Sequence, residues 1–512
     1  MKSRTFKSMR NTSLAVVSQI INSALCFIKR TIFIYALGNE YLGFNGLFSD
    51  ILTILSLAEL GVGTAVLYSM YKPAAEKDRK KMSALLNFYR HIYMIIGIFI
   101  TASGLCLIPF LNFFISDINY SKEVPIIYIL YLFNTSCSYF FIYKKSILIV
   151  EQNYYIISII EIIATLFQNT FQIIVLLIFK NFLIYLGVQI AGTLINNICI
   201  SIYIDKKYKY LKENKKEKLD KKTRGVIFKN IMAMFFSKIS SAVVTSTDNI
   251  LISKFVSTIL LGLYSNYTMF VSVIRLIFGK TFEAISGSVG NLIVTESKEK
   301  SFENYHKIWF LNFWLIGFCS ISLFILINSF IELWIGQGYV LNITIVFFIC
   351  LNLYMRLIRN TSLTFIESYG LFTSIKWKCI AEAVINLIAS LFYLKILNLG
   401  IIGVLLGTFS SNILTNFWYE PYVIYKKEFK RSLNDYFIKF IKYITAVFIT
   451  GITIYKICDF ITINNLYSKF VVNLIICCFL INIMFCVFFY KTKEFKYFSN
   501  CIIKILNNLK KS

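Results

Sequence analysis

Residues 470–490 read FVVNLIICCFLINIMFCVFFY and contain no charged side chain. A helix rises about 1.5 Å per residue, so this run is long enough to cross a hydrocarbon core of about 30 Å. Similar runs recur along the whole chain of 512 residues, of which 57% are hydrophobic and 15% charged. So few polar side chains cannot cover a water-soluble globule, and irregular backbone cannot face lipid. The sequence therefore predicts an all-α membrane protein with about fourteen transmembrane helices.

The predicted spans are separated by short connections. They are 12–37, 44–70, 84–110, 124–143, 154–179, 183–204, 226–253, 260–290, 307–330, 341–365, 377–396, 401–424, 437–458 and 470–490. Seven connections are expected on the outer side, around Gly38, Ser116, Lys180, Ser257, Gly336, Leu399 and Asn464. None is long enough to form an outward domain, so we expect no enzymatic activity.

The formal net charge is +27, from 53 Lys and Arg against 26 Asp and Glu. If the basic N-terminus is cytoplasmic and the helices alternate, roughly 38 basic residues of the aqueous segments lie inside and 6 outside. The positive-inside rule thus accounts for the charge without nucleic acid, and a basic inner face suits anionic membrane lipids. We expect a multi-pass protein of the bacterial cytoplasmic membrane with both termini inside.

The twelve cysteines lie nearly all within apolar spans, as at Cys26, Cys106, Cys199, Cys350 and Cys477. No CxxC or Cys/His spacing suits a metal, so they are interpreted as packing residues, and no metal or cofactor is expected. The first span is too long for a signal-peptide core and lacks a small-residue cleavage site. We therefore expect it to be retained.

One long basic stretch, 205–225, falls between the sixth and seventh spans and is interpreted as a cytoplasmic linker. It separates an N-terminal six-helix lobe (1–204) from a C-terminal lobe (226–430), and 431–512 adds two helices and a basic tail. Short segments match across the linker: those at Leu186 and Ile402 share the pattern of Gly187, Gly192 and Thr193 with Gly403, Gly407 and Thr408. Each follows a span with one glutamate, Glu161 or Glu382. We predict pseudo-repeated lobes with a substrate path between them.

Charges and polar stripes inside the spans indicate an aqueous interior, because intramembrane charge is costly unless it meets water or a partner. The candidates are Arg30, Lys238, Asp248, Arg275, Arg356, Glu59 and Glu161. Arg275 shares one helix face with Ser265, Thr268, Ser272 and Gly279. Stripes of Ser, Thr and Gly can instead be ordinary packing surfaces.

Buried charges could also be structural pairs, such as Arg30 with Asp248 or Arg275 with Glu59. Arg359 and Glu161 lie near the cytoplasmic ends of their spans, where long side chains can snorkel. A cavity lined by arginines suits an anionic passenger, since guanidinium binds phosphate oxygens in a bidentate geometry. Glu59, Asp248 and Glu161 are the candidate polar or coupling residues of the same cavity.

Several blocks of the sequence are familiar. The most specific is 30–48, RTIFIYALGNEYLGFNGLF, followed by Leu57–Gly63 and Leu67–Pro73. Further blocks are Asp248–Ser253, Gly262–Tyr267, Leu333–Gly336 and Trp418–Tyr422. Together these blocks resemble bacterial polysaccharide flippases, and the resemblance covers most of the first twelve spans.

This resemblance implies a member of the multidrug, oligosaccharidyl-lipid and polysaccharide exporter superfamily. Such proteins move an undecaprenyl-pyrophosphate-linked oligosaccharide to the outer leaflet for capsule, O-antigen or a related glycan, and a glycan polymerase and other assembly proteins are the partners it implies. Two six-helix lobes surround a basic cavity, and the lipid tail lies in an outer groove. The family's basic cavity residues correspond here to Arg30 and Arg275, and by extension to Lys238 and Arg356.

Other functions remain open. An ion-coupled multidrug antiporter of the same fold would prefer an acidic or aromatic cavity, which the arginines disfavour. A flippase for the lipid precursor of peptidoglycan is compatible with the charge pattern. A glycan polymerase or ligase would need a sizeable outward loop. A purely structural scaffold does not explain charges at mid-membrane.

Overall fold

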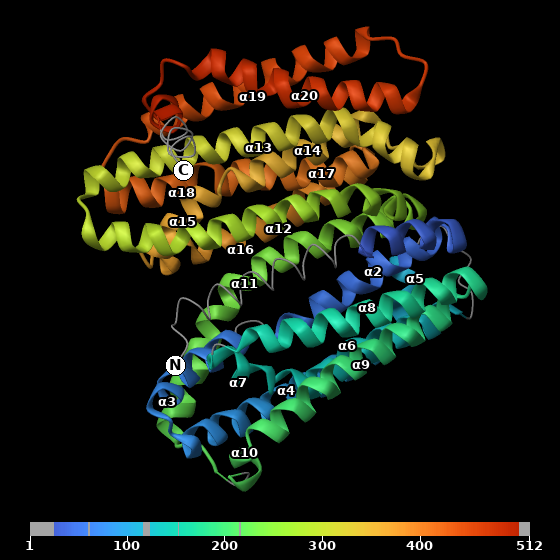
Figure 1. The fold of residues 1–512 in the computed structure, drawn as a ribbon, viewed down its shortest axis with the longest axis vertical. Helices are drawn as coiled ribbons and strands as arrows, with labels where there is room; N and C mark the ends of the chain where they lie inside the picture. Colours follow the sequence, from blue (N-terminus) through green and yellow to red (C-terminus); the bar gives the residue numbers. More distant parts are fainter. Residues whose placement is uncertain (1–24, 60–61, 116–122, 152, 215–216, 501–512) are drawn as a thin grey trace, which may run out of the picture. The chain divides into compact units, whose positions relative to one another are not determined.

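The computed structural model describes residues 25–59, 62–115, 123–151, 153–214 and 217–500, and within them some helical side chains are left undescribed. Most of the described residues are helical, and none of them lies in a strand. The chain divides into two compact units, 1–262 and 263–512 (Figure 1), which are described separately. The predicted boundaries at 204, 225 and 430 stay predictions.

In the first unit, a helix over 25–37 precedes the labelled helices. These are α2 (Asn39–Leu55), α3 (Val62–Glu76), α4 (Arg79–Leu107), α5 (Leu111–Phe114), α6 (Glu123–Ile142), α7 (Lys145–Val150), α8 (Tyr154–Ile178), α9 (Phe182–Lys207), α10 (Tyr210–Glu213) and α11 (Lys221–Phe255), with short 3₁₀ turns at Ser56–Glu59 and Ile108–Phe110. Helix α6 packs between α4 and α9, α8 packs on α9, and α11 packs on α2 and α3.

Helix α12 (Thr258–Thr295) leads into the second unit. There follow α13 (Lys298–Ile335), α14 (Ile343–Leu357), α15 (Asn360–Ser368), α16 (Phe372–Lys395), α17 (Gly400–Ser411), α18 (Phe417–Ile424), α19 (Asn434–Phe460) and α20 (Leu466–Phe489). A 3₁₀ turn, Gln337–Tyr339, precedes α14, and π-helical turns η4 (Asn412–Asn416) and η5 (Tyr425–Phe429) flank α18.

Local sequence explains where several helices begin. Asp78, Asn181, Ser297 and Asn465 each accept a hydrogen bond from the backbone of the first turn of α4, α9, α13 and α20. These side chains satisfy amide groups that a helix leaves unpaired at its N-terminus. Asp220 does the same for α11, and the hydrogen bonds from Thr223 lower the pKa of its carboxyl group.

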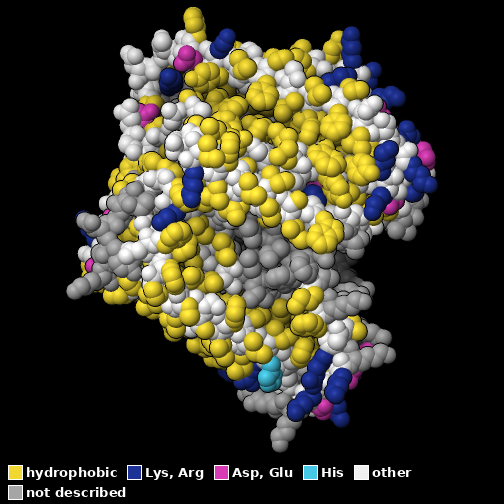
Figure 2. Space-filling view, turned by 180° about the vertical axis from the view of Figure 1, so that it is seen from behind, with side chains coloured by type: hydrophobic (Ala, Val, Ile, Leu, Met, Phe, Trp, Pro, Cys, Tyr) yellow, Lys and Arg dark blue, Asp and Glu magenta, His cyan; other side chains and the backbone are white. Residues whose placement is uncertain are grey.

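Eleven helical stretches of the described residues are long and apolar enough to cross a membrane. They correspond to eleven of the predicted spans and agree with an all-α membrane protein. The predicted span 12–37 lies partly outside the described residues, and 226–253 falls on α11, which is not among the eleven. The predicted span 44–70 differs, because α2 ends at Leu55 and a 3₁₀ turn follows. Figure 2 shows hydrophobic side chains over most of the visible surface, with Lys and Arg gathered mainly toward its edges.

The C-terminal hairpin α19–α20 packs on α13 through aromatic rings. Trp309 stacks on Tyr436 at a centroid distance of 4.6 Å, and Phe313 stacks on Tyr443 at 4.3 Å. On α20, Cys477, Ile481 and Phe485 are buried, while Phe479, Ile483 and Val487 on the other face are exposed. One face of the hairpin therefore belongs to the core of the second unit, and the other is suited to lipid.

Candidate functional site

The two units carry similar charge clusters, and each begins at a break in a helix. In the first unit, α6 ends at Ile142 and α7 begins at Lys145, after Lys144. The ammonium of Lys144 lies 2.7 Å from an Asp205 carboxylate oxygen and 2.6 Å from the Ser201 hydroxyl, both on α9. Lys145 forms an ion pair of 3.0 Å with Glu161 on α8.

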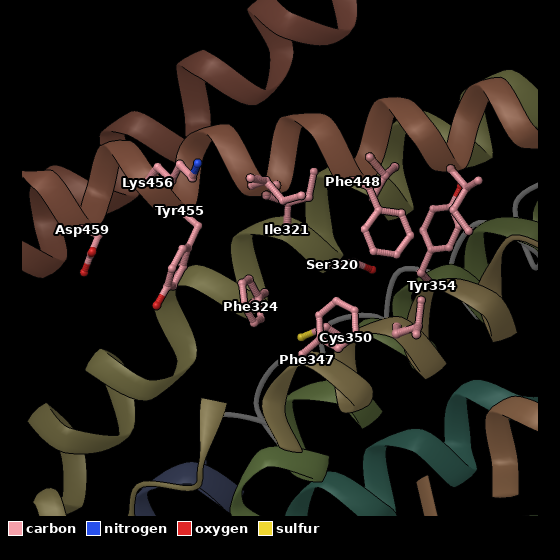
Figure 3. A pocket seen from close by; sticks show the side chains of 15 residues that line it. Ser320, Ile321, Phe324, Phe347, Cys350, Tyr354, Phe448, Tyr455, Lys456 and Asp459 are labelled. Carbon is pink, nitrogen blue, oxygen red and sulfur yellow. The ribbon is translucent and has the colours of Figure 1, made fainter. Parts of the chain in front are cut away.

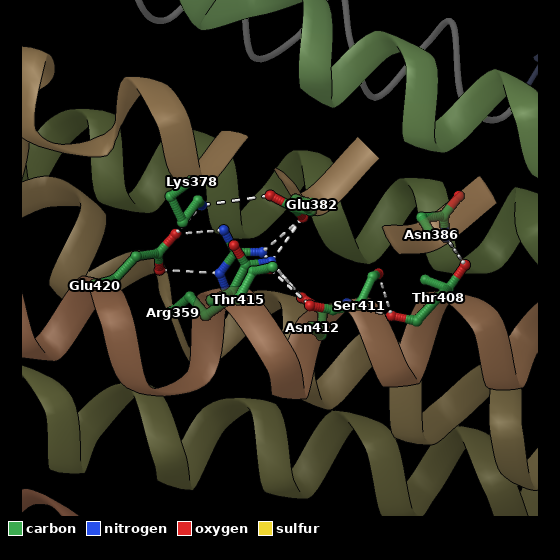
Figure 4. A network of polar contacts seen from close by, with 10 residues as sticks. Arg359, Lys378, Glu382, Asn386, Thr408, Ser411, Asn412, Thr415 and Glu420 are labelled. Atoms are coloured by element: carbon green, nitrogen blue, oxygen red, sulfur yellow. Dashed lines mark hydrogen bonds and ion pairs between the residues drawn. The ribbon is translucent and has the colours of Figure 1, made fainter. Parts of the chain in front are cut away.

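In the second unit, α14 ends at Leu357 and α15 begins at Asn360, after Arg359. The Arg359 guanidinium binds both carboxylate oxygens of Glu420, with Nε at 3.0 Å, and lies 3.6 Å from Glu382. Lys378 lies 2.7 Å from Glu420 and 3.3 Å from Glu382. Figure 4 shows these four side chains facing one another, which we call the Arg359 cluster.

Neighbouring amides complete the Arg359 cluster. Asn412 accepts a hydrogen bond from Arg359 at 3.1 Å, and Asn416 donates one to Glu382 at 2.6 Å. Both asparagines lie in the π-helical turn η4. Such a turn inserts a residue into an α-helix and re-aims the side chains around it, and it occurs frequently at functional sites.

The clusters occupy equivalent places in the pseudo-repeat. Lys144 and Arg359 lie at the same helix break, and Glu161 and Glu382 lie on the next long helix, α8 or α16. Asp205 lies on the helix that follows, α9, and Glu420 on α18, which continues α17 through the π-helical turn η4. Asp205 and Glu420 also follow the matching glycines Gly187 and Gly403 at nearly the same interval. The structure thus places the two halves of the sequence match in corresponding environments.

Helix packing repeats in the same way. A Cβ atom at Gly192 of α9 would lie 2.5 Å from Gln168 Oε1 of α8, and one at Gly407 of α17 would lie 2.7 Å from Ser390 Cα of α16. In both units, therefore, a glycine allows two neighbouring helices to approach closely at the matched position.

The clusters differ in burial. Side-chain exposure is 0% for Glu420 and 4% for Lys378, but 34% for Glu161 and 33% for Asp205. The Arg359 cluster contains two cations and two carboxylates, so its charges compensate one another. It is suited to holding α14, α16 and α18 together rather than to receiving an anion.

Two of the predicted site residues, Glu161 and Glu59, make contacts that the structure describes. Glu161 pairs with Lys145, as stated above. Glu59, in the 3₁₀ turn after α2, accepts a hydrogen bond of 2.6 Å from the Tyr93 hydroxyl, which itself receives one from Tyr89 at 3.1 Å. The predicted Glu59–Arg275 pair would join the two units and stays a prediction.

Arg275 lies on α12 and is partly buried, with exposed Val273, Leu276 and Ile277 around it. Its guanidinium donates to the Ser272 hydroxyl at 3.1 Å, the only hydrogen bond that it makes with a described residue. Ser272 and Arg275 belong to the stripe predicted from the sequence. A hydroxyl does not neutralise the guanidinium, so this cation keeps its capacity to bind an anion.

The structure also locates the other predicted residues. Arg30, Asp248 and Arg356 are partly buried on the helix over 25–37, on α11 and on α14. Lys238 lies on α11, but its side chain is outside the described residues. The Arg30–Asp248 pair stays a prediction.

Sequence reasoning missed several polar contacts. Asn249 donates to Asp50 at 2.6 Å between α11 and α2, and Lys29 donates to the buried Gln172 of α8 at 3.1 Å. Gln172 lies on α8, so this contact joins α8 to the helix over 25–37. Asp50 and Lys29 are charges in predicted spans, which is the signal that could have identified them. No described His, Cys, Asp and Glu side chains form a group suited to a metal ion.

No protein-family model and no curated protein matches the chain. Several solved structures, however, match its fold. An inward-facing multidrug resistance MATE family transporter of the MOP superfamily superposes with a TM-score of 0.61 at 16% identity, covering 79% of this chain and 97% of that one. The lipid II flippase MurJ, in an inward closed conformation, superposes with a TM-score of 0.64 at 18% identity, covering 93% of this chain and 98% of that one.

A Vibrio cholerae MATE transporter gives a TM-score of 0.55 at 11% identity, covering 84% of this chain and 100% of that one. Identities this low establish a shared fold. The chain therefore has the fold of MOP-superfamily membrane transporters, as the sequence resemblance implied at that level.

Proposed function

We propose that the chain is a flippase that moves an undecaprenyl-pyrophosphate-linked oligosaccharide from the cytoplasmic to the outer leaflet by alternating access, for capsule or O-antigen synthesis. The passenger is a large anionic lipid. Arg275 supports this assignment, because it is a partly buried cation whose described hydrogen bond goes to a neutral hydroxyl. Guanidinium binds the oxygens of a pyrophosphate in a bidentate geometry and stays protonated.

The observation that carries the proposal is the extent of the structural match. The MurJ structure covers 93% of this chain, so the match must extend beyond residue 430, into the part of the chain that contains α19 and α20. The two MATE transporters cover 79% and 84% of this chain. A protein named as a flippase of a lipid-linked molecule thus shares more of this chain than the drug transporters do. This supports a lipid-linked passenger over a small soluble one.

The test is complementation of a bacterial strain that lacks its own polysaccharide flippase but retains the rest of its glycan operon. Expression of the chain should restore surface glycan, measured by glycan-specific staining at matched protein levels. Failure to restore glycan with any of several flippase-deficient glycan systems, although the protein is inserted, would contradict the proposal.

The same extent of match favours a second candidate, a flippase for the lipid precursor of peptidoglycan. The chain would then sustain growth of cells depleted of MurJ while leaving surface glycan unrestored. A multidrug antiporter would instead raise the drug resistance of a pump-deficient strain. Running the three assays on one expression plasmid separates the three functions.

A further inference from the structure

The second unit contains a cavity of about 440 Å³ between α13, α14 and α19. Its walls are largely apolar, including Ile321, Phe324, Phe347 and Phe448 (Figure 3). The lining runs along α19 from Ile444 to Asp459, a distance of about 22 Å at the rise of a helix. That exceeds half of a hydrocarbon core of about 30 Å, so the cavity can take the chain of a lipid from one leaflet.

One end of this cavity carries two opposite charges. Lys456 and Asp459 are exposed and line it three residues apart on α19, and Figure 3 shows both at the end away from Tyr354. Within the described part of the chain, neither side chain forms an ion pair or hydrogen bond. A cation and an anion that line one cavity without pairing are complementary to a ligand that carries both signs.

The other end is apolar apart from two hydroxyl groups. Tyr354 and Ser320 are buried there, and neither hydroxyl has a hydrogen-bond partner among the described residues. A hydrocarbon chain supplies no partner for them either, whereas a single water molecule could. A charged headgroup is therefore better matched by the end that carries Lys456 and Asp459.

From this arrangement we infer that the cavity binds a zwitterionic phospholipid with a phosphate and an ammonium in its headgroup, such as phosphatidylethanolamine. Lys456 contacts the phosphate, Asp459 contacts the ammonium, and an acyl chain lies along the apolar wall. A polyprenyl phosphate has the phosphate but no ammonium, so it would bring a second negative charge toward Asp459. Phosphatidylglycerol also has a phosphate and no ammonium, so nothing in its headgroup would neutralise Asp459. The site is thus distinct from the passenger's and does not depend on the proposed function.

The experiment measures lipid retained by the full-length protein. The purified protein is equilibrated in turn with nanodiscs of phosphatidylethanolamine, phosphatidylglycerol or phosphatidylcholine doped with polyprenyl phosphate, and bound lipid is counted by native mass spectrometry. Wild type should retain phosphatidylethanolamine roughly tenfold better than phosphatidylglycerol, the ratio expected for one charge-assisted contact. Equal retention of phosphatidylethanolamine and phosphatidylglycerol would overturn the inference, and so would retention of polyprenyl phosphate that is lost when the cavity is filled by Gly451→Leu.

Three substitutions assign the roles. Lys456→Gln should reduce retention of both glycerophospholipids. Asp459→Asn should bring the retention of phosphatidylethanolamine and phosphatidylglycerol to the same level, because it removes both the contact with the ammonium and the repulsion of an anionic headgroup. Gly451→Leu should fill the cavity and abolish retention, since a Cβ at Gly451 meets only Ile321 at 3.8 Å and the added bulk extends into the space.

Two controls lie outside the headgroup end. Lys469→Gln removes a lysine near the start of α20 that does not line the cavity, and Ser320→Ala removes a hydroxyl at the inner end. Both should retain wild-type preference. If Lys469→Gln matches Lys456→Gln, lipid is held by general surface charge; if Ser320→Ala abolishes preference, the headgroup lies at the inner end. Either result contradicts the assignment.

Discussion

Two glutamates, one from each charge cluster, illustrate how burial changes the role of a charge. Glu161 has a side-chain exposure of 34% and one lysine partner, whereas Glu420 has an exposure of 0% and contacts both Arg359 and Lys378. Water screens the first pair, so it contributes little to stability. In the second, removing one partner leaves charge buried without compensation.

Glu420→Gln should therefore destabilise the protein by about 3–5 kcal/mol, because Arg359 and Lys378 would share the single carboxylate of Glu382. Thermal unfolding of the detergent-solubilised protein measures the loss. The matched control is Glu161→Gln, which should change stability by about 1 kcal/mol or less. Equal effects would show that the Arg359 cluster is not a stabilising element.

Arg275→Gln tests the binding of pyrophosphate, and so rests on the proposed function. Glutamine keeps hydrogen-bonding capacity but removes the charge, so the variant should insert normally and fail to restore surface glycan. Arg275→Lys should keep part of the activity, as a point charge without the bidentate fork. Ser272→Ala, which removes only the hydroxyl at 3.1 Å, should restore glycan nearly as well as wild type.

A structural pair between Arg275 and Glu59 predicts a different result. Arg275→Gln would then lower the amount of stable protein, and the double variant with Glu59→Gln would recover it. If cells with Arg275→Gln have normal surface glycan and normal protein levels, both roles of Arg275 are excluded: binding of pyrophosphate and a structural pair with Glu59. Protein amount and glycan therefore have to be measured in the same cells.

At the scale of elements, the sequence predicted the long helices well, because an apolar run of sufficient length can only be helical in lipid. It did not predict the break at Arg359 or the π-helical turn at Asn412, since neither interrupts the apolar run. The place of Arg359 near the end of its predicted span would allow it to snorkel, whereas its guanidinium is held by Glu420 and Glu382. These partners are far apart in the chain, and the periodicity of a single helix carries no information about such contacts. Glu420 lies in the block Trp418–Tyr422 that resembles the family, which was the available signal.

The close packing of α16 on α17 gives a prediction for an element pair. Gly407→Ala would place a Cβ 2.7 Å from the Ser390 backbone, which cannot move aside as a flexible side chain can. We expect a loss of about 1–3 kcal/mol in thermal unfolding experiments, as for other overpacked sites. The control is Gly187→Ala on α9, where a Cβ meets nothing within 4 Å and alanine should be neutral or slightly stabilising. A neutral Gly407→Ala would contradict the close approach.

At the scale of the whole molecule, a repeat of helix order, charge cluster and packing glycine is better evidence for duplicated halves than the short sequence matches alone. The two copies are not equivalent in chemistry. Lys378 lies four residues before Glu382 on α16, and the corresponding position before Glu161 on α8 is the buried Ile157. The first unit instead takes its second cation from Lys145 on α7. One copy has therefore buried its charges, while the other has left them partly exposed.

The net charge of +27 leads to a prediction about topology. Basic residues are retained on the cytoplasmic side during insertion, so the segment from Tyr208 to Asp220 should lie inside and the α8–α9 and α19–α20 turns outside. Cysteines introduced at Lys180 and Asn464 should react with a membrane-impermeant thiol reagent in intact cells. A cysteine at Lys218 should react only after the membrane is permeabilised. The native cysteines lie nearly all within predicted spans, and wild-type protein labelled in parallel gives their background. Labelling of Lys218→Cys in intact cells, with protection of the other two, would reverse the orientation and place the basic surface outside.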